Sequence, residues 1–192
     1  MNAHASAPPE GLEGVVAART VLSEVDGQAG RLIIRGRSLD DLAGQATFED
    51  LIALLFEGFF EDLPADLRAA LGAARAEVFA EVAHLDPGLL AREPVEAVRA
   101  LIARLADGDD LATALRLIAA PAVFTPAVVR SQAGQTPIAP DPALPHAADV
   151  LRMLTGAAPT AAQIAGLDAY LVTVSDHGLN ASTFAARVEA TT

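Results

Sequence analysis

Cysteine is absent from the 192-residue sequence. Its absence excludes a disulfide framework, a thiolate nucleophile and a thiolate metal site. The first residues also lack the basic-then-apolar pattern of a secretory signal peptide. We therefore expect a flexible N-terminus over residues 1–10 and a cytoplasmic location.

Positive charge is scarce, because 13 basic residues, all of them arginine, stand against 25 acidic residues and give a net charge of −12. A protein of this charge repels a phosphate backbone, so we expect no nucleic-acid partner. Long apolar runs are also missing. Charged residues recur every few positions, and no stretch approaches the ~18 uninterrupted apolar residues that cross a bilayer, so we expect no membrane partner.

Apolar residues make up 52% of the sequence, which is enough for one globular domain with a substantial core. Strand-favouring residues on both sides of the turn signal Asp26-Gly27 predict a short β-hairpin within residues 15–35. After Gly36 the apolar residues recur at helical spacing, interrupted by a proline-rich loop at 135–145. The predicted fold class is mainly α, a multi-helical domain with a short N-terminal β-hairpin.

Capping residues and prolines mark where the helices begin. Thr47 with Asp50, and Thr160 with Gln163, each match a capping box, in which a hydroxyl and a carboxylate or amide satisfy each other's backbone N–H groups. The predicted helices span about 47–55, 64–86, 94–105, 109–118, 121–130, 146–154, 160–174 and from 178 onward.

Four histidines are the candidates for polar chemistry. His4 lies in the expected flexible N-terminus and His84 near a helix end, so both are interpreted as surface residues. His146 follows a proline at the start of a helix, where an imidazole can bond backbone groups of the preceding loop, and a structural role is favoured for it.

His177 lies in a polar segment between two strongly apolar helices, which is where a buried polar site is expected. A helix beginning near Gly178 would point its free N–H groups at the same junction, so an anion could meet an imidazole and a positive helix end together. His177 is therefore a candidate for carboxylate binding. The alternative is that Asp176 and Asn180 only cap the last helix.

Two other kinds of site are rejected. Ser175, Asp176 and His177 are adjacent, so they cannot line up as a hydrolase triad, and no G-x-S-x-G elbow is present. The sequence has no H-E-x-x-H motif, no histidine pair at helical spacing, no calcium loop and no glycine-rich phosphate loop. We therefore expect no metal site.

Several short segments form a pattern in order along nearly the whole chain. The most specific is DHGLNASTFAARV at 176–188; the others are GLEGVVAA at 11–18, SEVDG at 23–27, GRLIIRG at 30–36, DDLA at 40–43, FED at 48–50, LL at 54–55, APDP at 139–142, HAA at 146–148 and MLTG at 153–156. This pattern resembles the citrate synthase family, which includes the 2-methylcitrate synthases.

The resemblance implies the large helical domain of a dimer, in which helices of both subunits pack together. In the family, the segment that matches 176–188 supplies a histidine that binds the carboxylate substrate oxaloacetate, and the motif assigns this role to His177. Asn180 and Ser182 are implied as supporting polar residues beside the catalytic centre.

The chain departs from the family in length and at individual positions. The family's chain is about twice as long, and its catalytic histidines and aspartate, its substrate-clamping arginines and its coenzyme A domain match nothing here. The resemblance thus implies a large-domain portion over 11–192 without the C-terminal half and small domain, with no catalytic residue and no bound cofactor; acetyl-CoA is the family's co-substrate. Val174 replaces a common histidine, Arg37 replaces a common aromatic residue, and 58–64 looks longer than the usual turn.

Two functions are compatible with the resemblance. The first is one half of a citrate synthase-type enzyme, which condenses acetyl-CoA with oxaloacetate to citrate in the tricarboxylic acid cycle and needs a complementing C-terminal half. The alternative is a non-catalytic interaction or regulatory module that associates with a full-length citrate synthase paralogue. The expected partners are an oxaloacetate-like dicarboxylate and either a second copy of the chain or the complementing half.

Overall fold

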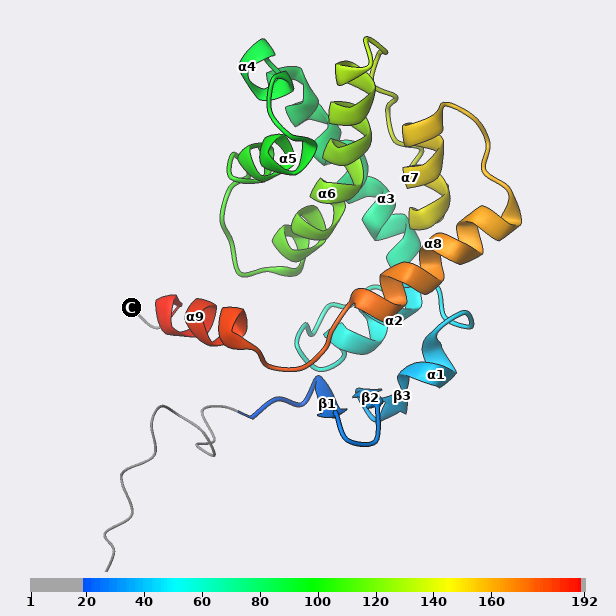
Figure 1. The fold of residues 1–192 in the computed structure, drawn as a ribbon, viewed down its shortest axis with the longest axis vertical. Helices are drawn as coiled ribbons and strands as arrows, with labels where there is room; N and C mark the ends of the chain where they lie inside the picture. The colour runs from blue at the N-terminus through cyan, green and yellow to red at the C-terminus, as the bar shows by residue number, and fades with distance from the viewer. Residues whose placement is uncertain (1–18, 191–192) are drawn as a thin grey trace, which may run out of the picture.

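The computed structural model describes residues 19–190, which form nine α-helices, one 3₁₀ helix and a small sheet (Figure 1). The prediction of a mainly α protein with an N-terminal hairpin is confirmed. The predicted flexibility of residues 1–10, and the part of the predicted hairpin before residue 19, lie outside the described residues.

The sheet is an antiparallel meander in the order β1-β2-β3. β1 (Ser23–Asp26) pairs with β2 (Arg31–Ile34), and β2 pairs with β3 (Arg37–Ser38). Oδ1 of Asp26 accepts a hydrogen bond from the backbone N–H of Ala29 at 2.9 Å, which fixes the turn at the predicted position. A short carboxylate side chain at the start of a turn satisfies the backbone in this way.

The helices begin largely where capping residues predict them. Both capping boxes are formed, at Thr47 with Asp50 and at Thr160 with Gln163. The helices are α1 (Leu39–Leu42), α2 (Phe48–Phe56), α3 (Leu67–Val78), the 3₁₀ helix η1 (Phe79–His84), α4 (Pro87–Leu90), α5 (Pro94–Ile102), α6 (Leu111–Gln132), α7 (His146–Thr155), α8 (Ala161–Val174) and α9 (Ala181–Glu189).

Several predicted helix boundaries are wrong. The helix predicted at 64–86 begins at Leu67, where Asp66 caps it, and changes to η1 after Val78. The helices predicted at 109–118 and 121–130 are one continuous helix, α6, although it contains Pro121 and Pro126. The helix predicted from 178 begins three residues later, at Ala181.

α6 is the central helix of the main core, and it contacts α3, α5 and α7 (Figure 1). By length and composition alone it could cross a membrane, but ten of its residues are buried inside the protein, which is typical of a core helix. This burial explains its continuity, because tertiary packing on three sides outweighs the hydrogen bonds lost at the two prolines. The fully buried residues of the main core include Leu71, Leu101, Phe124, Val128 and Met153.

A second, smaller core joins the hairpin to the rest of the molecule. It contains Ile34 of β2, Leu42 of α1, Leu51 of α2 and Val172 of α8, each at most 4% exposed. Asp168 strengthens the joint, because its Oδ1 accepts a hydrogen bond at 3.1 Å from the backbone N–H of Phe48, the first residue of α2. The hairpin is therefore packed beside the C-terminal end of α8, where the predicted site begins.

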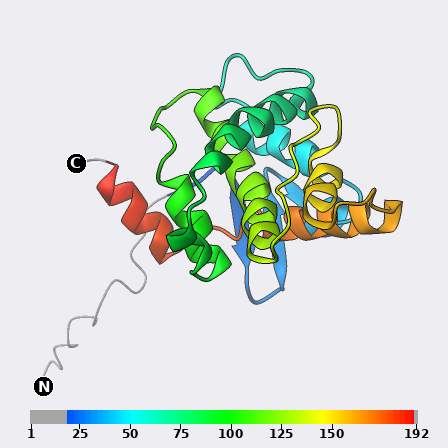
Figure 2. The same ribbon diagram turned by 90° about the horizontal axis from the view of Figure 1, so that it is seen from above.

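α9 lies at the edge of the molecule in both views (Figures 1 and 2). None of its residues is buried, and Phe184 is 47% exposed. Leu179, in the loop before α9, is exposed to the same extent. An amphipathic helix of this kind leaves an apolar surface open to a partner.

Candidate functional site

The loop 175–180 connects α8 to α9 and carries the predicted substrate-binding histidine. His177 is exposed, and its neighbours hold the loop. Oδ1 of Asp176 accepts a hydrogen bond from the backbone N–H of Gly178 at 2.8 Å, and the side-chain oxygen of Asn180 accepts one from the N–H of Thr183 at 2.8 Å. Because these bonds do not use the imidazole, the loop presents His177 without depending on it.

Gly178 allows the loop to approach the hairpin closely. Its φ is +84°, in the left-handed region that favours glycine, and a Cβ atom there would lie 2.8 Å from Cγ2 of Val25. Only a residue without a side chain fits both conditions. Gly178 therefore brings the loop 175–180 against β1, although the two are more than 140 residues apart in the sequence.

A cavity of about 560 Å³ lies between β1, the residues before it and this loop. Its wall contains two groups that can carry positive charge, Arg19 and His177, together with Glu24. Ser23 also lines the cavity, and its buried Oγ has no hydrogen-bond partner among the described residues. The remaining wall residues are Thr20, Val25, Gly178 and Leu179.

The other two predicted site residues are not among those that line this cavity. Asn180 is the N-cap of α9, and Ser182 is exposed in the first turn of that helix. The capping role of Asn180 agrees with the alternative considered for this segment, whereas Asp176 bonds within the loop instead of capping α9. A supporting role of Asn180 and Ser182 in substrate binding stays a prediction.

A buried ionic network surrounds His146, and most of its members were missed in the sequence. Arg75 of α3 and Asp149 of α7 form an ion pair at 2.9 Å, and both side chains are fully buried. Nη1 of Arg75 lies 3.3 Å from Nδ1 of His146. Because a guanidinium only donates hydrogen bonds, Nδ1 accepts and the ring proton sits on Nε2.

Glu49 of α2 completes the network, because its Oε1 accepts a hydrogen bond at 2.7 Å from the backbone N–H of His146. The network also fixes the proline-rich loop 135–145, since Arg75 donates to the carbonyl of Leu144 at 2.9 Å. The ionic network is closed off from solvent. The structural role favoured for His146 is therefore consistent with its contacts, which join three helices and one loop.

The same loop packs tightly on α3. A Cβ atom at Gly72 would lie 2.1 Å from the carbonyl oxygen of Pro142, so only glycine permits this contact. The close approach brings the carbonyls of the loop within reach of Arg75, which lies one turn further along α3.

Burial, together with a smaller effect of the neighbouring positive charge of Arg75, lowers the pKa of His146 to about 3. The unfolded chain has the ordinary histidine pKa near 6.5, so it binds the proton first as the pH falls. The stability that the fold has with His146 neutral is fully present above about pH 6.5. The free energy of unfolding then falls progressively as the pH is lowered toward 3.

We expect the free energy of unfolding to fall by up to ~1.4 kcal/mol per pH unit from this group across that interval. Urea unfolding measured between pH 4 and pH 7 tests the expectation. The variant His146→Asn keeps an acceptor but does not titrate, so its unfolding free energy should depend less steeply on pH. The exposed His84→Asn variant is the control, and an equal slope in His146→Asn and the wild type would contradict the prediction.

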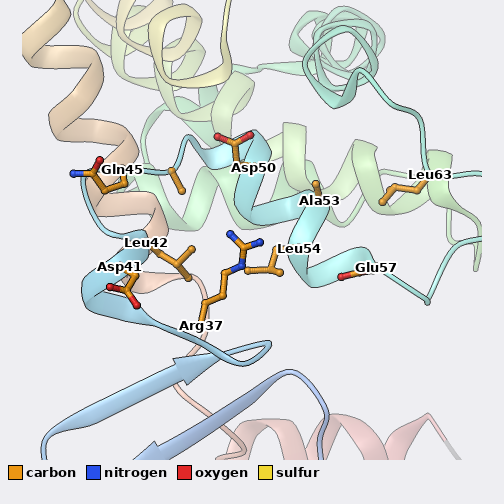
Figure 3. A pocket seen from close by; sticks show the side chains of 10 residues that line it. Arg37, Asp41, Leu42, Gln45, Asp50, Ala53, Leu54, Glu57 and Leu63 are labelled. Atoms are coloured by element: carbon orange, nitrogen blue, oxygen red, sulfur yellow. The ribbon is translucent and has the colours of Figure 1, made fainter.

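A third feature is a cavity of about 560 Å³ between the hairpin, α1 and α2 (Figure 3). Figure 3 shows the guanidinium of Arg37 lying beside Leu54. Asp41, Asp50 and Glu57 also line the cavity, so its charged groups sum to a negative charge. This charge disfavours an anionic substrate, unlike the cavity beside His177. Within residues 19–190, no group of three or more His, Cys, Asp or Glu residues could hold a metal ion.

The described residues have the mainly α fold of citrate synthases, matched over about half of the length of those structures. The citrate synthase of Thermotoga maritima aligns with 94% of this chain and 50% of its own, with a TM-score of 0.76 and 26% identity. The citrate synthase of Thermoplasma acidophilum, solved with carboxymethyl coenzyme A and oxaloacetate, has a TM-score of 0.71 at 22% identity and supports the fold alone.

Sequence comparison then identifies the family. The family sequence model described as "Citrate synthase, C-terminal domain" matches residues 11–192. The 2-methylcitrate synthase of Mycobacterium tuberculosis is 34% identical over 196 residues, which cover 95% of this chain and 49% of that protein. The citrate synthase of Haloferax volcanii is 37% identical over 207 residues, covering 95% and 52%. The chain belongs to the citrate synthase family, and it spans about half the length of these relatives.

Proposed function

We propose that this chain supplies the oxaloacetate-binding histidine of a citrate synthase-type acyltransferase, which condenses acetyl-CoA with oxaloacetate to citrate. The observation that carries the proposal is the position of His177, exposed in the wall of a cavity that also contains Arg19. An imidazole and a guanidinium in one cavity suit a dicarboxylate, because both can donate charge-assisted hydrogen bonds to carboxylate oxygens.

The proposal assigns binding to this chain and proton abstraction to residues outside it. The condensation needs a base that removes a methyl proton next to the thioester, and donors that hold the developing enolate. His146 cannot serve as this base, because it is buried and bonded to Arg75. His84 lies beside Glu81 at the surface, with 2.9 Å between Nδ1 and a carboxylate oxygen, away from the cavity that His177 lines.

The proposed partner is a polypeptide that carries the second half of the citrate synthase fold, assembled with this chain as a dimer of such pairs. Exposed apolar side chains at the end of α8 and in the next loop support an association. Tyr170 is 62% exposed, Val174 52% and Leu179 47%. Large apolar side chains close together at the surface are typical of contact sites.

The same exposed side chains favour a second candidate function, a non-catalytic module that binds a full-length citrate synthase paralogue. The two candidates differ in what the partner lacks. In the first candidate function, neither polypeptide alone catalyses the condensation. In the second, the paralogue is active alone, and this chain changes its activity or assembly.

Release of free thiol from acetyl-CoA in the presence of oxaloacetate separates the candidates. We expect no release above background from this chain alone, and release when a polypeptide with the second half of the fold is added. Activity of a full-length paralogue alone, together with its co-elution with this chain, would favour the second candidate. Robust release from this chain alone would overturn the assignment of proton abstraction to outside residues.

A further inference from the structure

Helix α2 is tied at its two ends to two different parts of the molecule. At its N-terminal end, Oδ1 of Asp168 in α8 accepts a hydrogen bond from the backbone N–H of Phe48 at 3.1 Å. At its C-terminal end, the guanidinium of Arg35, the residue after β2, donates to the carbonyl of Leu54 at 3.2 Å and to the carbonyl of Glu57. The hairpin and α8 are therefore fixed to the same helix.

Both ties match the charge at the end of the helix that they contact. The N-terminal end of a helix carries a partial positive charge, and the C-terminal end carries a partial negative charge. Asp168 brings a carboxylate to the first end of α2, and Arg35 brings a guanidinium to the second. Hydrogen bonds that involve a charged group are stronger than bonds between neutral groups. The two ties thus hold α2 more firmly than neutral side chains would.

The backbone of Arg35 has an unusual conformation. Its φ is +49°, and within residues 19–190 no other non-glycine residue has a positive φ. Such a conformation is uncommon and persists where the surrounding structure holds it. Arg35 and Gly36, whose φ is +81°, form the two-residue turn between β2 and β3. The backbone N–H of Arg35 also donates to the carbonyl of Leu22, just before β1, at 2.7 Å, so Arg35 connects the hairpin to α2.

We propose that Arg35 and Asp168 are positioning residues, which hold the hairpin and α8 on α2 and so fix the cavity between β1 and the loop 175–180. The apolar contacts between these parts come from the second, smaller core. Apolar contacts are not directional, whereas a hydrogen bond requires a narrow range of distances and angles. The two ties therefore set the orientation of the hairpin relative to α8. The consequence for substrate binding rests on the proposed function.

The turn allows the tie of Arg35 to be removed without breaking the hairpin. Asn tolerates a positive φ, and Asn-Gly is a preferred pair for a two-residue turn in which both residues have a positive φ. Arg35→Asn therefore keeps the turn and removes the guanidinium. At the other end of α2, Asp168→Ala removes the acceptor, whereas Asp168→Asn retains a side-chain oxygen that accepts a hydrogen bond from the N–H of Phe48.

The absence of cysteine allows the arrangement to be measured with spin labels. Gln28→Cys in the exposed turn of the hairpin and Ala165→Cys at an exposed position of α8 place one label on each part. We expect pulsed electron paramagnetic resonance on this full-length labelled chain to give one narrow interlabel distance. Arg35→Asn and Asp168→Ala should each broaden this distance, and Asp168→Asn should keep it narrow. Arg37→Asn, at an exposed position of β3, is the matched control and should also keep it narrow.

An unchanged narrow distance in both Arg35→Asn and Asp168→Ala would overturn the inference. A broadened distance in Arg35→Asn together with faster hydrogen exchange of the β1 and β2 amides would also overturn it, because the hairpin would then have come apart instead of moving. None of these measurements involves oxaloacetate or acetyl-CoA, so thiol release still decides the proposed function separately.

The link to substrate binding has its own readout. In the assembly that releases thiol, Arg35→Asn should raise the KM for oxaloacetate more than it lowers kcat, because it moves the walls of the binding cavity and not the residues that abstract the proton. An unchanged KM alongside a broadened interlabel distance would overturn the inference that the two residues position the site.

Discussion

Arg75→Met is expected to lower the free energy of unfolding by about 3–5 kcal/mol, the largest effect on stability that we expect from a single substitution in this chain. The reason is the burial of its partner. Asp149 is fully buried with Arg75, and removal of the guanidinium leaves a carboxylate inside the protein without its ion pair. The contacts that Asp149 keeps, to the partly exposed Arg152 at 2.7 Å and to the backbone N–H of Asp141 at 3.1 Å, offset only part of this loss.

The substitution also removes hydrogen bonds that tie α3 to its neighbours. Arg75 donates to the carbonyl of Leu144 and contacts Nδ1 of His146. Both acceptors are then left without this donor, which adds to the cost because unsatisfied buried polar groups are destabilising. The loop 135–145 should therefore loosen first, and hydrogen exchange of its amides should become faster than in the wild type.

Urea unfolding at pH 7 measures the expected loss, with Arg31→Met as the control. Arg31 pairs with Asp26 at the surface, where an exposed ion pair contributes about 0–1 kcal/mol. The double variant Arg75→Met with Asp149→Leu should recover part of the stability, because it removes the uncompensated charge. A loss below about 1 kcal/mol in Arg75→Met would show that the buried pair does not hold the fold.

The ionic network also shows where prediction from sequence reaches its limit. Arg75 occupies a core-facing position of α3, between Leu71 and Val78, and this interruption of an apolar stripe was the only local signal. Its partner Asp149 lies 74 residues further along the chain. Sequence spacing describes neighbours on one helix, so it cannot show that two distant charges neutralise each other inside a core.

Local signals predicted the helix starts well and helix continuity poorly. The capping boxes at Thr47 and Thr160 depend only on residues three positions apart, and both are formed. Pro121 and Pro126 predicted a break that α6 does not have. Tertiary contacts of α6 with three other helices decide whether the helix continues through its prolines. Such contacts are not visible in a short window of sequence.

The proposed site contains one residue that the sequence predicted and others that it did not. His177 was predicted from its polar segment and from the family motif, which are contiguous in sequence. Arg19 and Ser23 were not selected, because they meet His177 only where Gly178 packs on Val25. The cavity wall opposite the motif is therefore a product of the tertiary fold, set by the position of the hairpin against α8.

His177→Ala is expected to weaken oxaloacetate binding by the active assembly by about one to two decades and to leave stability nearly unchanged. A hydrogen bond to a charged acceptor is worth roughly 1.5–3 kcal/mol, and ~1.4 kcal/mol corresponds to one decade in affinity. Stability should hold because the ring is exposed and the loop is fixed by Asp176 and Asn180.

A purely structural role of His177 predicts the reverse result, a lower melting temperature with unchanged oxaloacetate affinity. Both quantities are therefore measured on one variant, by thermal unfolding and by the oxaloacetate dependence of thiol release. His84→Ala is the matched control, since His84 is also exposed but lies beside Glu81 at the end of η1. Unchanged oxaloacetate affinity in His177→Ala would remove His177 from the site.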